Sequence, residues 1–532
     1  METEKSPVPN VIVDELAQQA KLANDVEHQS TVWQAIKGNF WAIFWSLMVS
    51  MCVVMEGYDT ILLGNFYAYP QFAKKFGTFI PSDNSYQLTA AWQAGLSNGS
   101  GVGAFFGAIM NGALVDRFGQ KPVLLSSLVS LSGFLFIVFF ATNKPTLLVG
   151  EILCGFPWGV FATTGPAYAS EVLPMALRPY LTSWTNMCFI IGQLIAAGVL
   201  AGLVGVDSEW SYRVPFALQW VWPAFLIPIL FFAPESPWHL VRKGRLDDAR
   251  KSLERLQNPR ATVSVDATLA LMVLTNKDEQ EELQVETSYW QLFRGVDRRR
   301  TEIACISFAG QITSGLVFAY NSVYFFQQVG LSTKQTYDLN VGGNALALLG
   351  TIVSWVAVMP YLGRRTIYLW GMLTMSIILY IIGILNVWTT HSSVGLAQAV
   401  LTLIWTFVFQ LSVGQLGWSL PAEVGSTRLR QKTVVVARDT YYITSVISSV
   451  LNPYLLNPTA WNVKGYTGFV YGTTSLLTFI WAFFRLPETR NRTFEELNQL
   501  FSKKIPARHF QEYEVNVFET ESSDKQTVLH IG

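Results

Sequence analysis

The sequence predicts an all-α membrane protein with twelve transmembrane helices in two pseudo-symmetric six-helix bundles. Hydrophobic residues make up 51% of the 532 residues and charged residues only 14%, whereas a soluble chain carries about a quarter charged residues. Uncharged runs recur that can cross about 30 Å of hydrocarbon, for which about 20 helical residues suffice. Short motifs also recur at matching positions of the two halves. Composition, run length and repetition together predict this fold class.

The uncharged runs define the expected elements in order. The first six spans are expected at 39–66, 89–115, 123–142, 145–171, 179–205 and 213–233, and the second six at 303–326, 340–362, 366–388, 394–421, 433–456 and 466–486. The predicted domains are a cytosolic tail (1–38), an N-terminal bundle (39–233), a cytosolic linker domain (234–300), a C-terminal bundle (301–486) and a second cytosolic tail (487–532). Apolar residues at helical spacing (Leu246, Ala249, Leu253, Leu256) predict short amphipathic helices in the linker domain. A disordered linker is the alternative.

The distribution of cations predicts the orientation in the membrane. Lys and Arg residues cluster in alternate short loops, and such loops are retained in the cytoplasm. An even number of spans then places both termini in the cytoplasm. The formal net charge is zero, which gives no indication of nucleic acid binding. The cysteines (Cys52, Cys154, Cys188, Cys305) fall in four different predicted helices, so neither a disulfide framework nor a metal site is expected.

The sequence contains no motif that is typical of an enzyme active site. A nucleotide-binding loop, a metal-ligand cluster and a nucleophile motif are all missing from it. We therefore expect neither an enzyme nor a protein with a cofactor.

Three motifs repeat between the halves, and one of them is Gly119-Gln120-Lys121, which follows the second span as Gly363-Arg364-Arg365 follows the eighth. Residues 166–171 (PAYASE) end the fourth span with Glu171, and Pro421-Ala422-Glu423 ends the tenth. Pro234-Glu235-Ser236 follows the sixth span, and Pro487-Glu488-Thr489 follows the twelfth. Duplicated halves of this kind are a design of membrane transporters.

A carboxylate lies within the first span. Asp59 occupies an otherwise apolar run, where a buried acid takes up a proton or finds a cationic partner. Glu56 lies three residues earlier and shares its helix face, and Arg438 in the eleventh span is a candidate partner for whichever acid is ionised. We therefore expect Asp59 to carry a coupled proton and Glu56 to share or tune it. A static buried ion pair is the alternative.

Five motifs in the expected order identify a family. They are GYDT (57–60), GALVDRFGQK (112–121), PAYASE (166–171), PESPWHLVRKGR (234–245) and PETRNRTFEEL (487–497). With them, nearly the whole chain resembles the sugar porter branch of the major facilitator superfamily, and it is most similar to the fungal maltose and general α-glucoside:proton symporters. The resemblance implies proton-coupled uptake of a sugar such as maltose by alternating access, in a multi-pass, monomeric protein of the plasma membrane. Transport of another small metabolite, or sugar sensing without transport, are the alternatives.

The resemblance also implies a cytoplasmic latch that locks the outward-facing state through charges at helix ends. The matching residues are Asp116, Arg117, Glu171, Arg178, Glu235, Arg364, Arg365, Glu423, Arg428 and Glu488. Pro360 stands where the family's acid precedes Gly-Arg-Arg, which predicts a weaker latch in the second half. Ordinary loop charges are the alternative, because exposed ion pairs contribute little to stability.

One departure from the family adds a coupling candidate. Many sugar porters have Gly-Arg near the start of the fourth span, whereas this chain has Gly150-Glu151. Glu151 is therefore a second candidate for protonation. The alternative is a carboxylate near the helix end that reaches water.

The implied sugar site lies near mid-membrane and uses amides, hydroxyls and aromatic rings. The matching residues are Gln193, Gln311 and Trp418, and further candidates are Tyr320, Asn321 and Asn344. For each amide, a hydrogen bond between helices is the alternative. Gly310 replaces a family glutamine, and a family asparagine is replaced near Leu316. We expect these changes to enlarge the cavity for a larger glycoside or a non-sugar metabolite.

Overall fold

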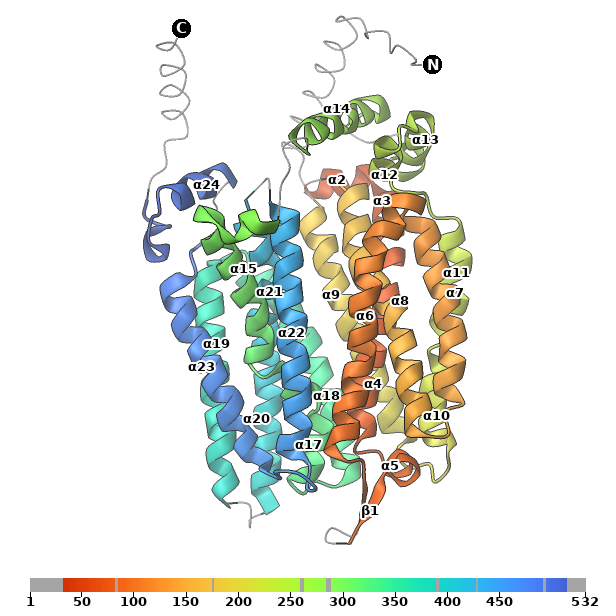
Figure 1. Cartoon of the computed structure of the whole chain (residues 1–532), viewed down its shortest axis with the longest axis vertical. Helices are drawn as coiled ribbons and strands as arrows, with labels where there is room; N and C mark the ends of the chain where they lie inside the picture. The colour runs from red at the N-terminus through yellow and green to blue at the C-terminus, as the bar shows by residue number, and fades with distance from the viewer. Residues whose placement is uncertain are drawn as a thin grey trace, which may run out of the picture. The chain divides into compact units, whose positions relative to one another are not determined.

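The helices of this computed structural model fall into two compact units (Figure 1). The structure describes residues 32–81, 85–174, 177–258, 263–283, 289–388, 392–426, 429–490 and 494–513. The first unit contains Met1–Leu63 and Leu96–Glu286, and the second contains Gly64–Gly95 and Thr287–Gly532. The segment Gly64–Gly95 thus packs with the second unit, although it precedes most of the first unit in the sequence.

The described residues of the first unit form helices and the loops between them. The helices are α2 (Val32–Gly38), α3 (Phe40–Ser50), α4 (Cys52–Phe66), α6 (Ala90–Phe118), α7 (Gln120–Phe139), α8 (Lys144–Val172), α9 (Arg178–Leu203), α10 (Trp210–Leu218), α11 (Val221–Phe231), α12 (Pro237–Arg242), α13 (Leu246–Leu256) and α14 (Val265–Leu283). The last turn of α4 and the start of α6 belong to the second unit.

The second unit adds a short β-hairpin to its helices. The hairpin pairs β1 (Thr78–Ile80) with β2 (Ser85–Gln87) in antiparallel register, with Thr78 opposite Gln87. The helices are α5 (Pro70–Phe76), α15 (Gly295–Thr313), α16 (Leu316–Tyr320), α17 (Ser322–Gln328), α18 (Thr333–Val353), α19 (Arg364–Leu385), α20 (Ser392–Leu411), α21 (Val413–Val424), α22 (Arg430–Leu456), α23 (Thr467–Arg485) and α24 (Phe494–Ser502). Short 3-10 or π segments are η1 (Tyr289–Phe293), η2 (Ser354–Val358), η3 (Asn386–Trp388), η4 (Lys464–Tyr466) and η5 (Ala507–His509).

All twelve predicted spans coincide with helices or with consecutive helices. Within the described residues, ten helical segments are long and apolar enough to cross a membrane. The other two spans are α6 and α22, of 29 and 27 residues. Glycine and amide residues lower the hydropathy of α6, and Arg438 and Asp439 lower that of α22. The all-α membrane fold is confirmed, and the β-hairpin is an addition that the sequence analysis did not predict.

Several spans are divided into consecutive helices, and two of these breaks lie in the seventh and tenth spans. The seventh breaks after α15, where Gly315 has a φ of 103°, a left-handed conformation that glycine adopts without steric cost. The tenth breaks between α20 and α21 at Ser412. The last carbonyl groups of a helix lack intrahelical donors, so each break presents backbone oxygens to neighbouring side chains.

The helices α12, α13 and α14 gather at one end of the first unit (Figure 1). The predicted amphipathic helix is confirmed as α13, and its residues Ala249, Leu253 and Leu256 are buried. Leu240 of α12 and Met272 of α14 pack in the same cluster as Leu253. Leu246 was expected on this face but is 43% exposed, because it starts the helix at the edge of the cluster.

The helices α4 and α9 pack so closely that only glycine fits at two positions. A Cβ atom at Gly57 would lie 2.0 Å from the carbonyl oxygen of Phe189, and one at Gly192 would lie 2.0 Å from that of Val54. Because the obstructing atoms are backbone atoms, they cannot move aside as a side chain can. This contact fixes the part of α4 that carries the predicted coupling acids.

We expect Gly192→Ala to destabilise the protein by about 1–3 kcal/mol, the usual effect of overpacking a well-packed contact. Thermal unfolding of the purified protein in detergent should show a lower midpoint temperature. The control is Gly198→Ala in the same helix, where nothing lies within 4 Å of the added atom. Equal midpoints for the two variants would contradict this account of the contact.

Candidate functional site

Asp59 lies in α4 and is only 5% exposed. The side-chain amide of Gln219 donates a hydrogen bond of 2.9 Å to its carboxylate. Gln219 is the C-cap residue of α10, at the break between α10 and α11. The indole N–H of Trp158 in α8 also lies near this carboxylate, without hydrogen-bond geometry. Gln219 was not predicted, although an amide side chain within the sixth apolar span is a signal in the sequence that points to it.

Glu151 lies in α8 and is 1% exposed. Both of its carboxylate oxygens lack a hydrogen-bond partner among the described residues. Its carboxylate interacts electrostatically with that of Asp59. At this exposure the side chain does not reach water, so the structure brings together two of the predicted coupling acids in a buried place. Glu56, the third acid, is half-buried in the same helix as Asp59.

Gln193 in α9 is the predicted sugar-binding residue of the first unit. Its side chain is 3% exposed, and its amide nitrogen has no hydrogen-bond partner among the described residues. The close contact of α9 with α4 at Gly192 places this amide one residue from the packed backbone. An unused donor of this kind can bind a hydroxyl group of a ligand.

Unlike Gln193, Gln311 in α15 uses its side-chain amide for a hydrogen bond to another helix. Its nitrogen donates to the carbonyl oxygen of Gly414 at 2.9 Å, in the first turn after the break between α20 and α21. A Cβ atom at Gly417 would lie 2.3 Å from the same nitrogen, so this glycine makes room for the contact. The observed bond is the helix-to-helix alternative, and the role of Gln311 in sugar binding stays a prediction.

Gly310 does not enlarge a cavity. A Cβ atom at this position would lie 1.9 Å from the hydroxyl oxygen of Tyr368. That hydroxyl donates to the carbonyl oxygen of Ser307 at 3.2 Å, and Tyr368 is fully buried. The expectation of extra space was wrong at this residue, because a tyrosine from α19 fills the place that a longer side chain would take.

Arg438 in α22 lies among aromatic rings of the second unit. Its guanidinium group is 4.3 Å from the ring centroid of Trp418 and 5.0 Å from that of Tyr442. The rings of Phe308 and Tyr441 lie slightly farther away. Aromatic faces stabilise a cation that has lost water. Trp418, a predicted sugar contact, is 44% exposed. The predicted pairing of Arg438 with an acid of the first unit stays a prediction.

The remaining sugar-site candidates belong to hydrogen-bonded groups of the second unit. Asn344 donates to the carbonyl oxygen of Asn340 at 2.9 Å, and the side-chain oxygen of Asn340 accepts from Asn65 at 3.1 Å. Asn321 directly follows α16, and its side-chain amide donates to the carbonyl oxygen of Val317 in that helix. Tyr320 is the last residue of α16. Their roles in sugar binding stay predictions.

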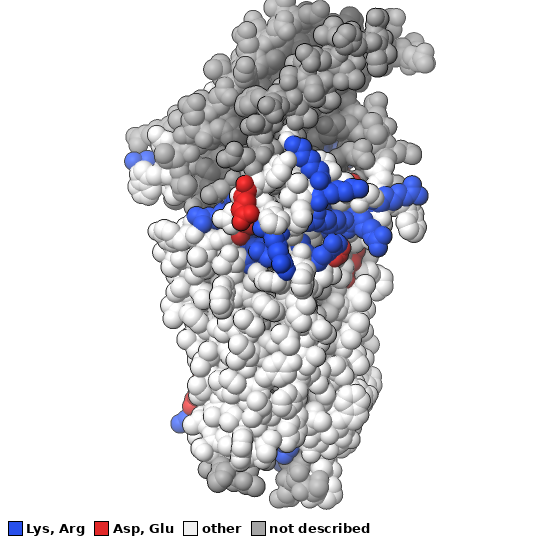
Figure 2. All heavy atoms as spheres, turned by 90° about the vertical axis from the view of Figure 1, so that its left-hand side faces the viewer, with Lys and Arg blue, Asp and Glu red and all other residues white. Residues whose placement is uncertain are grey.

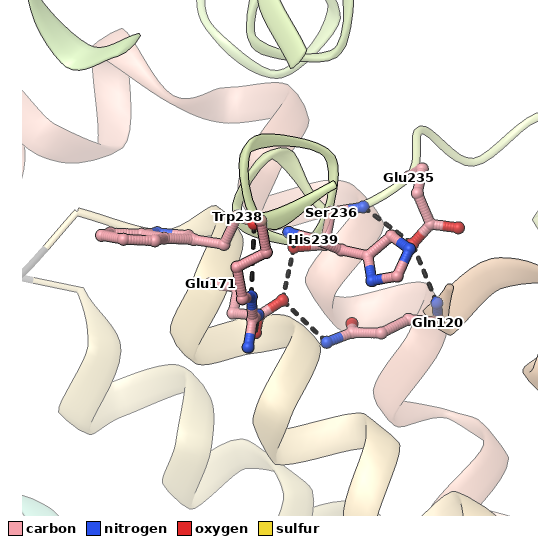
Figure 3. Close-up of polar contacts among 7 residues, drawn as sticks. Gln120, Glu171, Glu235, Ser236, Trp238 and His239 are labelled. Carbon is pink, nitrogen blue, oxygen red and sulfur yellow. Dashed lines mark hydrogen bonds and ion pairs between the residues drawn. The ribbon is translucent and has the colours of Figure 1, made fainter. Parts of the chain in front are cut away.

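A polar cluster lies where α7, α8 and α12 meet (Figure 3). Glu235 accepts from the backbone N–H of Gln120 at 2.9 Å, at the first residue of α7. A Cβ atom at Gly119 would lie 2.6 Å from this carboxylate, so the glycine of the Gly-Gln-Lys motif makes room for it. Negative charge at a helix N-terminus is stabilised by unpaired N–H groups and by the helix dipole.

Glu171 completes this cluster. It accepts from the side-chain amide of Gln120 at 2.7 Å and from the hydroxyl of Ser236 (Figure 3). It also forms an ion pair with Arg242. His239 lies beside these acids, and loss of hydration on burial lowers the pKa of its imidazole from the ordinary value.

The second unit repeats the arrangement. Glu488 accepts from the backbone N–H of Arg364 at 2.7 Å, at the first residue of α19. A Cβ atom at Gly363 would lie 2.1 Å from its carboxylate. Glu423 accepts from the hydroxyl of Thr489 at 2.6 Å and pairs with the Arg364 guanidinium at 3.6 Å. The two echoed sequence motifs therefore build the same cluster twice.

The other predicted latch residues differ in their environments. Asp116 and Arg117 are exposed, and Arg117 lies over the ring of Phe118. Arg365 donates its backbone N–H to Glu488 and its side chain to the carbonyl oxygen of Phe483. The Pro360 carbonyl, where the family has an acid, accepts from Arg490 at 2.6 Å. Arg428 and the side chain of Arg178 lie outside the described residues. Latch contacts between the halves stay a prediction.

We expect Glu235→Gln to lower the free energy of unfolding by about 1 kcal/mol, because a neutral amide oxygen is a weaker acceptor for the N–H groups at the start of α7. The midpoint of thermal unfolding in detergent measures the change. Glu254→Gln is the matched control, since Glu254 lies at the surface and forms an exposed pair with Arg250. A midpoint for Glu235→Gln equal to that of the control would show that this carboxylate does not support the helix.

Comparison with known proteins identifies the family. A family model described as "Sugar (and other) transporter" matches residues 45–501. A maltose permease of Saccharomyces cerevisiae is 39% identical over 517 residues, which cover 96% of this chain and 84% of that protein. A general alpha-glucoside permease of the same organism is 38% identical over 505 residues, with 94% and 81% covered.

Solved structures show the same fold. The proton:xylose symporter XylE, bound to 6-bromo-6-deoxy-D-glucose, superposes with a TM-score of 0.68 at 21% identity, over 87% of this chain and 100% of that chain. A partially occluded inward open structure of the xylose transporter from E. coli gives a TM-score of 0.67 at 19% identity, over 85% and 99%. At this identity the likeness concerns the fold alone. Because the family model spans most of the chain and the permeases are similar along nearly all of it, this multi-pass membrane protein belongs to the family described as "Sugar (and other) transporter".

Proposed function

We propose that this chain takes up an α-glucoside such as maltose together with protons, across the plasma membrane, by alternating access. The sugar class is supported by the relatives, since permeases named for maltose and for alpha-glucosides are 37–39% identical over 94–98% of this chain. The observation that carries the proton coupling is the buried pair of carboxylates Asp59 and Glu151.

The surroundings of the two acids suggest different roles. Two buried carboxylates that act on each other do not readily both carry charge, so the pair holds at least one proton. Glu151 has no hydrogen-bond donor among the described residues, which favours its neutral form. Asp59 accepts from Gln219, which stabilises its ionised form. Asp59 is therefore the acid that releases and takes up the transported proton, and Glu151 keeps the local charge low.

Sugar recognition is proposed to use the unused amide donor of Gln193 and the exposed ring of Trp418. Sugar hydroxyls need donors and acceptors, and the apolar face of a sugar ring packs on aromatic side chains. Gln193 is buried with an unpartnered nitrogen, and Trp418 is partly exposed. The secondary candidates are Tyr320, Asn321 and Asn344. The side-chain amides of Asn321 and Asn344 already donate hydrogen bonds within the second unit.

The repeated glutamate clusters are proposed to lie at the cytoplasmic ends of the helices. Lys and Arg residues are frequent in the loops at these ends, which favours their retention in the cytoplasm. Both termini and the helices α12–α14 then lie in the cytoplasm, and the sequence-based domain limits stand as part of the proposal. We further propose that the protein works as a monomer and that these clusters act as a conformational latch.

The coupling proposal predicts that Asp59→Asn abolishes accumulation of maltose against a gradient and leaves exchange of maltose across the membrane. The reason is that an amide cannot bind and release the proton. Uptake of labelled maltose by transporter-deficient yeast, at low and neutral outside pH and with a protonophore, measures accumulation. Counterflow into preloaded vesicles measures exchange.

The matched control for this experiment is Asp338→Asn, which removes an exposed carboxylate from α18. Full accumulation by Asp59→Asn would refute the role of Asp59. If the unchanged protein reaches the membrane but moves neither maltose nor glucose, the sugar proposal fails and other metabolites become the candidates.

We expect Gln193→Leu to weaken maltose binding about fivefold, the effect of losing about one hydrogen bond of 1 kcal/mol, without lowering the amount of folded protein. The contrasting variant is Gln311→Leu, which removes a hydrogen bond between α15 and α21 and should reduce folded protein instead. The apparent KM of uptake and the yield of monodisperse protein separate the two effects. An unchanged KM for Gln193→Leu would remove this residue from the sugar site.

A further inference from the structure

A cavity of about 400 Å³ lies in the second unit between α15, α23 and the segment that follows α24. Three cations line it, namely Arg299, Arg485 and Lys504. The rings of Phe484 and Phe501 form apolar walls. The cavity thus combines positive charge with aromatic surface.

The positive charge of this cavity is only partly neutralised. Glu302 is paired with Arg485 through its guanidinium group, with an Nε to Oε1 distance of 2.9 Å, and also accepts from Trp481. Neither Arg299 nor Lys504 forms an ion pair within the described part of the chain. This leaves an excess of two cations at the cavity.

Arg299 is held in place and keeps an unused donor. Its Nη1 donates to the carbonyl oxygen of Ile505 at 2.8 Å, and its guanidinium lies over the rings of Phe501 and Phe510. Its Nε is buried without a hydrogen-bond partner among the described residues. A guanidinium held in place at the wall of the cavity suits the attraction of a phosphate group through its fixed charge.

Around the cavity, further cations lie on one side and exposed apolar side chains lie on the other. Figure 2 shows Lys and Arg gathered at one end of this face, above a broad surface with little charge. The exposed cation Arg508 lies 4.8 Å from the ring of Phe484. On the other side, α23 presents Leu477, Ile480 and Phe484, which are 61%, 45% and 58% exposed. Their spacing of three and four residues places them on one helix face.

We propose that this cavity binds the phosphate-bearing headgroup of an anionic phospholipid, with an acyl chain along the exposed face of α23. A free phosphate would use the cations but leave the apolar face uncovered, whereas a lipid satisfies both. Basic pockets at the cytoplasmic ends of membrane helices suit such headgroups, because that leaflet carries the anionic lipids. The inference uses the proposed orientation and goes beyond transport itself.

The test is lipid retention by the full-length protein. Protein purified from nanodiscs of phosphatidylcholine with a minor fraction of phosphatidylserine or a phosphatidylinositol phosphate is analysed by native mass spectrometry. We expect Lys504→Gln to weaken binding of the anionic lipid about fivefold, the effect of removing one cation near the membrane surface. Arg299→Gln tests the fixed guanidinium in the same way.

Lys503→Gln is the matched control, since Lys503 is exposed, lies over the ring of Tyr513 and does not line the cavity. Equal retention by Lys504→Gln, Arg299→Gln and this control would overturn the proposal, and so would equally tight binding of a soluble inositol phosphate. If Arg299→Gln fails to fold, Lys504→Gln decides, because its side chain is exposed. Lipid binding is read independently of sugar uptake, so either proposal can fail alone.

Discussion

Hydrocarbon offers no hydrogen-bond partners, so the polar groups inside this protein depend on one another. The breaks in the seventh and tenth spans show the consequence, because Gln311 donates to a carbonyl oxygen beside one of them. Asp59 is supplied with a donor by Gln219, which itself caps a short helix. Against this background, several buried polar atoms are exceptions without a partner among the described residues, and the oxygens of Glu151 and the side-chain nitrogen of Gln193 are among them. Exceptions in such surroundings are where protons and ligands are expected to bind.

The two glutamate clusters supply hydrogen-bond acceptors for backbone N–H groups at helix ends. Each unit places a glutamate on the first N–H groups of a helix, with a glycine that leaves room for it. Each also joins a second glutamate to a Ser or Thr hydroxyl. The described contacts are within single units, so they first of all stabilise each bundle. A carboxylate that stabilises a helix end can still exchange one cationic partner for another. The same glutamate can therefore both stabilise its bundle and act in the proposed latch.

The length of the runs with little charge was sufficient to predict the twelve spans, because crossing a bilayer requires such runs whatever their packing. It also placed α6 and α22, although α6 is glycine-rich and α22 carries Arg438. The motifs predicted Asp59 and both glutamate repeats. What could not be predicted depends on distant contacts: the donor Gln219, the left-handed Gly315, and the use of Gln311 on a backbone oxygen. Periodicity reports which face is apolar, but it does not report which atom from another helix fills a given space.

The contact of Gly310 with Tyr368 links two positions that lie 58 residues apart in the sequence. A residue larger than glycine fits at position 310 only if the hydroxyl group of Tyr368 moves away. A smaller residue in place of Tyr368 alone would leave a void beside Gly310. Change at this place therefore proceeds through a pair of substitutions, of which each one alone is unfavourable. Related chains should differ at both positions or at neither, and the order in which the two changes arise limits the evolutionary routes that are open to this part of the protein.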